Sequence, residues 1–271
     1  RKRFTRIVYP FVAWCILYAG YFVLTRGESV GDMFVHILHI PVNFGCEVGH
    51  LWYIYMLIGL YLVTPIISPW LERASKRELE GYLGLWVLTT FLPYIHTVYP
   101  EVLGEAFWND TPLLYYFTGF IGYFILGYYL KRYGYPSVAL SWILLIAGYI
   151  VTATVFCSRI DTVATIPELE LSWRFCSVNV MMMSLGLFSL IGRIKLNGSR
   201  RGTQLLADIS IKSYGMYLAH IMLLNLYYGL FSPLFEAAYI TIPIISVCTF
   251  ITVYLLVKVL SWLPKSKYLI G

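Results

Sequence analysis

SVALSWILLIAGYIVTATVFC, residues 137–157, contains no Asp, Glu, Lys or Arg. A helix needs roughly 20 mainly apolar residues to cross the hydrocarbon core of a bilayer, and this run is long enough to do so. Comparable runs lie near 7–24, 49–70, 82–98, 112–130, 172–192, 209–230 and 239–263. The sequence therefore predicts an all-α, polytopic bundle of about eight transmembrane helices in a single domain over residues 1–271.

The composition argues against a water-soluble domain. Of the 271 residues 59% are apolar and 13% are charged, and the mean hydropathy is +0.71, whereas soluble domains carry roughly a quarter charged residues. Most Lys and Arg residues lie in alternate connections, at 1–6, 73–77, 131–132, 193–201 and 265–267. Cytoplasmic loops carry such an excess, so both termini are predicted to be cytoplasmic. Contact with anionic lipids then explains the net charge of +6. The expected partner is the lipid bilayer, and no nucleic acid is needed.

His50 lies at the predicted outer end of the second span, within Gly49-His50-Leu51-Trp52-Tyr53-Ile54-Tyr55. Histidine titrates near neutrality and can move a proton in catalysis. The alternative is an interfacial histidine beside aromatic residues that mark the membrane surface. The residues alone leave both interpretations open.

The seventh span carries a polar stripe. Steps of three and four residues place Ser210, Ser213, Tyr217 and His220 on one helix face, with Tyr214 beside them. Lipid does not accommodate such a stripe, so it is predicted to face the bundle or a cavity, as functional polar groups in membranes do. The alternative is a structural role in hydrogen bonding between helices.

The basic start of the chain, Arg1-Lys2-Arg3-Phe4-Thr5-Arg6, has two interpretations. It fits an ordinary cytoplasmic flank of a membrane helix. It also fits a phosphate site, because the guanidinium groups of Arg3 and Arg6 match phosphate oxygens. The five cysteines are scattered without a CxxC pair, so no metal site is predicted.

Several of these segments resemble a known family. RFTRIVYPF at 3–11, HLWYIY at 50–55 and LYLVTP at 60–65 resemble motifs of the membrane acyltransferase 3 family, and SIKSYGMYLAH at 210–220 resembles its C-terminal signature. These motifs occur in the family's order and extend over nearly the whole chain. It implies a multi-pass enzyme of the bacterial inner membrane. Such enzymes move an acyl group, with acetyl the expected one, from cytoplasmic acyl-CoA to a sugar hydroxyl of a surface or lipid-linked glycan.

The resemblance also implies residue roles. Arg3 and Arg6 match the family's cytoplasmic arginine motif and are expected to bind the phosphates of acyl-CoA (acetyl-CoA), the donor substrate; no permanently bound cofactor is expected. Trp52 and Tyr55 are expected to line the side of the site that receives the acceptor. Ser213, Tyr214 and Tyr217 are the candidates for lining the passage between the two membrane faces. His50 and His220 are the candidates for proton transfer.

Two departures from the family pattern qualify these expectations. Family members carry two helices ahead of the arginine motif, giving about ten in all, and the first of them holds the histidine considered the main acid/base. The chain is therefore expected to be an N-terminally truncated, inactive piece. Relatives that acylate surface sugars often have a glutamate where Leu57 stands and a glutamine at Gly59. Because Leu57 replaces that glutamate, the sequence argues against a carboxylate-assisted step on the helix that follows Trp52.

The sequence thus predicts a glycan O-acyltransferase that modifies a polysaccharide or lipid-linked sugar. A transporter or flippase of a small polar or lipid-linked substrate is the main alternative, since it also explains a polar stripe within a bundle. No internal repeat of the kind common in transporters is evident. A non-catalytic subunit of a glycan-assembly complex is a third possibility.

Overall fold

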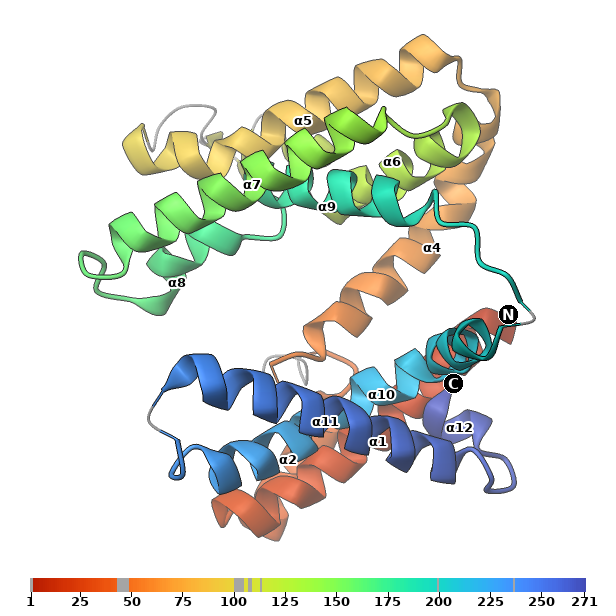
Figure 1. The fold of residues 1–271 in the computed structure, drawn as a ribbon, viewed down its shortest axis with the longest axis vertical. Helices are drawn as coiled ribbons and strands as arrows, with labels where there is room; N and C mark the ends of the chain where they lie inside the picture. The colour runs from red at the N-terminus through yellow and green to blue at the C-terminus, as the bar shows by residue number, and fades with distance from the viewer. Residues whose placement is uncertain are drawn as a thin grey trace. The chain divides into compact units, whose positions relative to one another are not determined.

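The computed structural model describes residues 2–42, 49–99, 105–106, 109–112, 114–198, 200–235 and 237–271. Helices account for most of this part of the chain (Figure 1). They are α1 (Lys2–Arg26), α2 (Val30–His39), α4 (Trp52–Arg73), α5 (Lys76–Val98), α6 (Phe120–Tyr133), α7 (Val138–Arg159), α8 (Ile166–Leu169), α9 (Val178–Ile191), α10 (Arg201–Phe231), α11 (Ala238–Leu260) and α12 (Lys267–Ile270), with the 3₁₀ turns η1 (Tyr115–Phe117) and η2 (Glu170–Trp173). The short strands β1 (Glu105–Ala106) and β2 (Asn109–Pro112) pair antiparallel.

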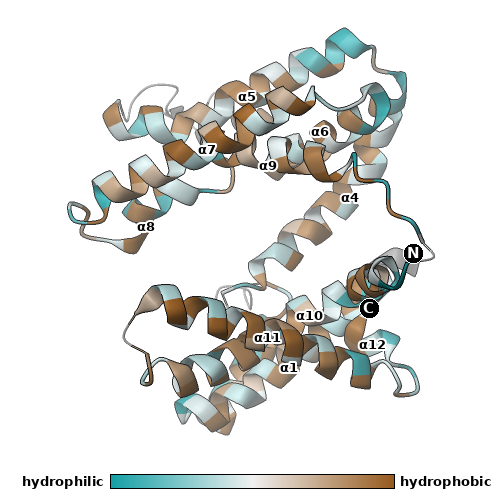
Figure 2. Cartoon of the chain, in the orientation of Figure 1, coloured by the Kyte–Doolittle hydropathy of each residue, from teal (hydrophilic) through white to brown (hydrophobic). Residues whose placement is uncertain are grey.

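Five helical segments of the described chain are long and apolar enough to cross a membrane. They are Thr5–Arg26, Trp52–Arg73, Val138–Arg159, Glu170–Ile191 and Ala238–Leu260. Figure 2 shows apolar residues along much of α7, α9 and α11. These segments support a multi-pass membrane protein, while the count of eight spans stays a prediction.

The start of α6 differs from the predicted span at 112–130. The helix begins only at Phe120, because Gly119 adopts a φ of +83°, a backbone region that glycine enters readily and other residues avoid. α6 has 14 residues. At 1.5 Å per residue it is about 21 Å long, which is shorter than a bilayer core of roughly 30 Å.

The first turn of α2 explains where this short helix begins. Ser29 Oγ accepts a hydrogen bond from the Asp32 backbone N–H at 3.1 Å, and the Asp32 carboxylate accepts one from the Ser29 backbone N–H at 2.9 Å. This reciprocal pair is a capping box, which satisfies backbone donors at the helix start. The hydrogen bonds from Ser29 also lower the pKa of Asp32.

The chain forms two compact units, residues 1–62 with 196–271 and residues 63–195. In the first unit α1 binds α10 through two tyrosines. Tyr214 Oη donates to the Ile7 carbonyl at 2.7 Å, and Tyr18 Oη donates to the Leu218 carbonyl at 2.9 Å. Since both contacts follow the same order along the two helices, α1 and α10 run in the same direction. In the predicted topology consecutive spans alternate in direction, so its first and seventh spans are also expected to run in the same direction.

The second unit is held by a close approach of α7 and α9. A Cβ at Gly148 would lie 2.5 Å from the Asn179 carbonyl oxygen, so only glycine permits this spacing. The fully buried Asn179 side chain donates to Thr152 Oγ1 at 2.8 Å and accepts from Tyr94 Oη at 2.8 Å. Interhelical hydrogen bonds of this kind stabilise helix packing within a bilayer. The Asn179 contacts are therefore structural.

Candidate active site

His50 sits in the turn that precedes α4, and its neighbours fix that turn. Gly49 adopts a φ of +78°, which reverses the chain just before the helix. Leu51 and Ile54 follow and are fully buried in the core of the first unit, packed with residues of α1 and α10. Burial of two aliphatic side chains at this point holds His50 against the unit's interior.

His50 and His220 lie together although 170 positions separate them in the sequence. Their ring centroids are 4.8 Å apart and the rings are nearly perpendicular, at 79°. Tyr217 contacts both, with its ring centroid 5.3 Å from that of His50 and 5.6 Å from that of His220. The Tyr217 hydroxyl also donates to the His50 carbonyl, and the Tyr18 ring lies 5.6 Å from His50. Two histidines and two tyrosines thus form one cluster within the first unit.

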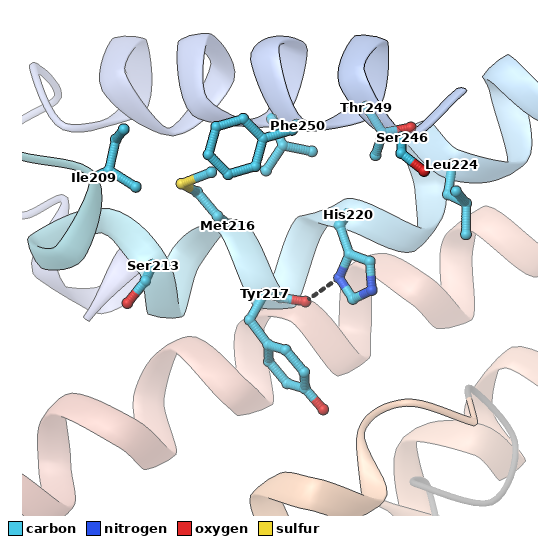
Figure 3. Close-up of a pocket in the computed structure, with 10 residues that line it drawn as sticks. Ile209, Ser213, Met216, Tyr217, His220, Leu224, Ser246, Thr249 and Phe250 are labelled. Carbon is cyan, nitrogen blue, oxygen red and sulfur yellow. Dashed lines mark hydrogen bonds between the residues drawn. The ribbon is translucent and has the colours of Figure 1, made fainter. Parts of the chain in front are cut away.

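The hydrogen bond of His220 determines which of its nitrogens can take a proton. Nδ1 lies 2.6 Å from the Tyr217 carbonyl oxygen (Figure 3). A carbonyl oxygen can only accept, so Nδ1 must carry the hydrogen. In the neutral ring Nε2 then has the lone pair. The local α10 backbone thereby prepares Nε2 as a proton acceptor.

A cavity of about 430 Å³ lies between α10 and α11. Its polar lining comes from Ser213, Tyr217 and His220 of α10 and from Ser246 and Thr249 of α11. Its apolar lining consists of Ile209, Met216, Leu224, Phe250 and Val253. Figure 3 shows Met216 and Phe250 between the two helices, and the Tyr217 ring on the side of α10 away from α11. Three members of the predicted stripe therefore share a cavity, whereas its lining does not include Ser210 in the described part of the chain.

Arg6 and Tyr214 share a second, smaller cavity of about 200 Å³ in the first unit, lined also by Ile7, Tyr61 and Ile211. Arg6 is exposed, and its Nη2 lies 3.3 Å from the Gly271 carbonyl oxygen. Tyr214 therefore faces α1 and not the α10–α11 cavity. Arg3 is part of α1, but its side chain lies outside the described residues.

Trp52 and Tyr55 lie elsewhere on the unit. The Tyr55 hydroxyl donates to the Ile40 carbonyl, and its ring meets Phe11 edge-on with centroids 5.1 Å apart. Trp52 contacts Tyr53 edge-on at 6.2 Å. Tyr55 thus connects α4 to α1 and to the end of α2. Neither side chain lines the α10–α11 cavity or the cavity beside Arg6.

Sequence reasoning missed a charged group at the start of the polar stripe. Asp208 forms a salt bridge with Lys212, and its other oxygen accepts from the Tyr254 hydroxyl at 2.7 Å. The hydrogen bond from Lys212, and then that from Tyr254, lowers the pKa of Asp208. The four-residue spacing of Asp208 and Lys212 is the one signal that could have indicated this pair. No sequence pattern points to Tyr254 or Tyr18.

A metal centre has no obvious place in the part of the chain that the structure describes. No group of three or more His, Cys, Asp or Glu side chains there is arranged to hold a metal ion.

Comparison with family models identifies the family of the chain. The model of the acyltransferase 3 family, described as an acyltransferase domain, matches residues 1–262. No curated protein and no solved structure matches the chain significantly. Because the family match covers nearly the whole chain, and the helices are of membrane-spanning length, the chain belongs to the acyltransferase 3 family and is a membrane acyltransferase.

Proposed function

We propose that this protein is an O-acyltransferase of the bacterial inner membrane. It moves an acyl group, with acetyl the expected one, from cytoplasmic acyl-CoA to a sugar hydroxyl of a surface or lipid-linked glycan. The observation that supports this most strongly is the His50–His220–Tyr217 cluster, because it combines a prepared proton acceptor with an adjoining cavity.

The reaction needs one proton transfer and one exchange of bonds at carbon. Nε2 of His220 accepts the proton of the sugar hydroxyl as the sugar oxygen attacks the thioester carbonyl carbon. The new C–O bond forms, the C–S bond breaks, and the departing sulfur takes the proton to give the free thiol of CoA. A thioester is already activated, so holding both reactants in a site without water supplies much of the rate.

The neighbours of His220 suit the charge that develops on it. Once protonated, the imidazolium lies beside the ring of Tyr217, tilted by 37° with centroids 5.6 Å apart, and beside the ring of His50 at 4.8 Å. Aromatic faces attract cations at about this range. His50 therefore supports His220 and shares the proton-transfer role, and Tyr217 holds both in place.

Arg6, together with Arg3, is proposed to hold the CoA phosphates at the start of α1. Arg6 meets the criteria for such a site, since it is exposed and borders a cavity. Tyr214 at that cavity and His220 at the other are six residues apart on α10. That spacing is about 9 Å along the helix axis. One helix thus connects the proposed phosphate site to the proposed reaction centre, with Tyr217 between them and Ser213 next to Tyr214. Trp52 and Tyr55 are proposed to border the acceptor's approach.

Arg6→Ala should raise the KM for acyl-CoA about tenfold while leaving kcat nearly unchanged. The reason is that a phosphate–guanidinium hydrogen bond contributes to donor binding and not to the chemical step. Initial rates at varied acyl-CoA concentration measure this. Arg26→Ala, at the other end of α1, is the matched control and should leave the KM unaltered. An unchanged KM in Arg6→Ala would remove Arg6 from the donor site.

A transfer assay with purified full-length protein tests the function itself. The protein in lipid nanodiscs receives acetyl-CoA labelled in the acetyl group and a glycolipid fraction from the source membranes. We expect label in the glycolipid that mild alkali releases, as it releases an ester. Label that stays in acetyl-CoA over a panel of acyl-CoA donors and glycan fractions would count against the proposal.

A further inference from the structure

The wall that α11 contributes to the α10–α11 cavity holds a hydroxyl group to which the proposed mechanism gives no role. Thr249 lines the cavity, and only 6% of the residue is exposed. Its Oγ1 is buried and has no hydrogen-bond partner among the described residues. Leaving a buried hydroxyl unsatisfied costs free energy, and the cost is greater in an apolar surrounding. A ligand that supplies a partner removes that cost.

Two other hydroxyl groups of α11 bond to the backbone of their own helix. Ser246 Oγ donates to the Ile242 carbonyl at 2.7 Å, and Thr241 Oγ1 donates to the Ala237 carbonyl at 3.1 Å. Both bonds reach back four residues, which is the usual arrangement for Ser and Thr within helices. Thr249 makes no such bond among the described residues. Its hydroxyl is therefore buried without a partner in a wall of the cavity, where an occupant that reaches it can supply one.

The surroundings of Thr249 indicate the chemistry of that occupant. Met216, Phe250 and Val253 provide an apolar wall, and His220 lines the same cavity. In neutral His220 the free acceptor is Nε2. Nε2 can accept a hydrogen bond from a hydroxyl group of the occupant but cannot pair with its carbonyl oxygen. A carbonyl oxygen only accepts, and the Thr249 hydroxyl can donate to it. A molecule with a carbonyl group and an alkyl chain matches this lining.

We propose that the α10–α11 cavity binds the acyl group of the donor thioester, with the Thr249 hydroxyl donating to its carbonyl oxygen. This inference rests on the proposed function. As the sugar oxygen attacks, the carbonyl oxygen gains negative charge, so the hydrogen bond from Thr249 strengthens in the transition state. Thr249 is then a catalytic residue that acts on the acyl group, while His220 acts on the acceptor hydroxyl.

Two CoA analogues that cannot react isolate this contact in the full-length protein. Acetyl-carba(dethia)-CoA keeps the carbonyl in a ketone, and S-ethyl-CoA is a thioether without a carbonyl. Binding of each is measured by calorimetry on wild type, Thr249→Val and Thr249→Ser. Wild type should bind the ketone about fivefold more tightly than the thioether. Thr249→Val should lose this preference and lower kcat about 10²-fold, while Thr249→Ser should retain most of both.

Thr241→Val is the matched control, because Thr241 is also buried on α11 but has its own hydrogen bonds. It should lower the melting temperature and keep the preference for the ketone. Thr249→Val breaks no bond within the described protein, so its melting temperature should not fall. If Thr249→Val keeps the wild-type preference, or changes only the KM of the sugar acceptor, the assignment of Thr249 is wrong. If neither analogue binds to wild type, acyl-CoA is not the donor, and the proposed function fails together with this inference.

Discussion

Replacing His220 with glutamine is expected to lower kcat for acyl transfer by about 10²- to 10⁴-fold, the range over which a positioned general base contributes. Glutamine can still donate toward the Tyr217 carbonyl that His220 Nδ1 contacts at 2.6 Å. It has no basic nitrogen where Nε2 stands, so proton transfer is lost while the packing is largely kept. Thiol release from acyl-CoA in the presence of the glycan acceptor measures the effect.

Two comparisons make the His220 result specific. His39→Gln, at the exposed end of α2, should keep wild-type kcat. Binding of S-ethyl-CoA to His220→Gln should match wild type, because His220 is proposed to act on the acceptor hydroxyl and not on the donor. A kcat within threefold of wild type in a folded His220→Gln protein would exclude His220 as the proton acceptor.

Asp208→Asn is expected to destabilise the protein, seen as a fall of a few degrees in melting temperature. The change leaves Lys212, whose side chain is 11% exposed, without its counter-ion. Loss of one partner is most costly when both charges are fully buried. The cost here is smaller because the Asp208 side chain is 34% exposed, so solvent screens the pair. Asp208→Asn combined with Lys212→Met should recover most of the loss, since it removes both charges.

The same pair makes stability depend on pH. Hydrogen bonds from Lys212 and Tyr254 lower the pKa of Asp208 in the folded protein relative to the unfolded chain. The stabilisation is therefore complete above the unfolded-state pKa and is lost as the pH falls through the folded-state pKa. Melting temperatures on acidification should fall less steeply in Asp208→Asn than in wild type. Asp161→Asn, in an exposed loop, should follow wild type. Identical acid slopes in wild type and Asp208→Asn would contradict the role given to the pair.

The helices could be predicted from the sequence because membrane spans are long apolar runs, and 137–157 corresponds to α7 nearly residue for residue. The start of α6 could not, since hydropathy carries no information on the positive φ of Gly119. The polar stripe of α10 was also predictable, because helical periodicity places Ser213, Tyr217 and His220 on one face. Tyr214 lies next to them in sequence, but its hydroxyl turns to α1.

The candidate site itself needed the fold. His50 and His220 come from segments far apart in the chain, and periodicity within one helix cannot bring them together. Thr249 lies in an apolar run where a threonine normally bonds to its own backbone, as Thr241 does. Only the contacts reveal that Thr249 does not. Pairing across helices and unmet hydrogen bonds are properties of packing, which a single sequence does not encode locally.

Mass spectrometry of the surface and lipid-linked glycans of the source organism is the most direct measurement of acyl transfer. It compares cells with the full-length gene, cells without it, and deleted cells that carry wild type or His220→Gln. We expect an ester-linked acyl mass that disappears on deletion, returns with wild type and does not return with His220→Gln. An unchanged acyl profile with an accumulated precursor glycan would contradict acyl transfer and indicate a transporter instead.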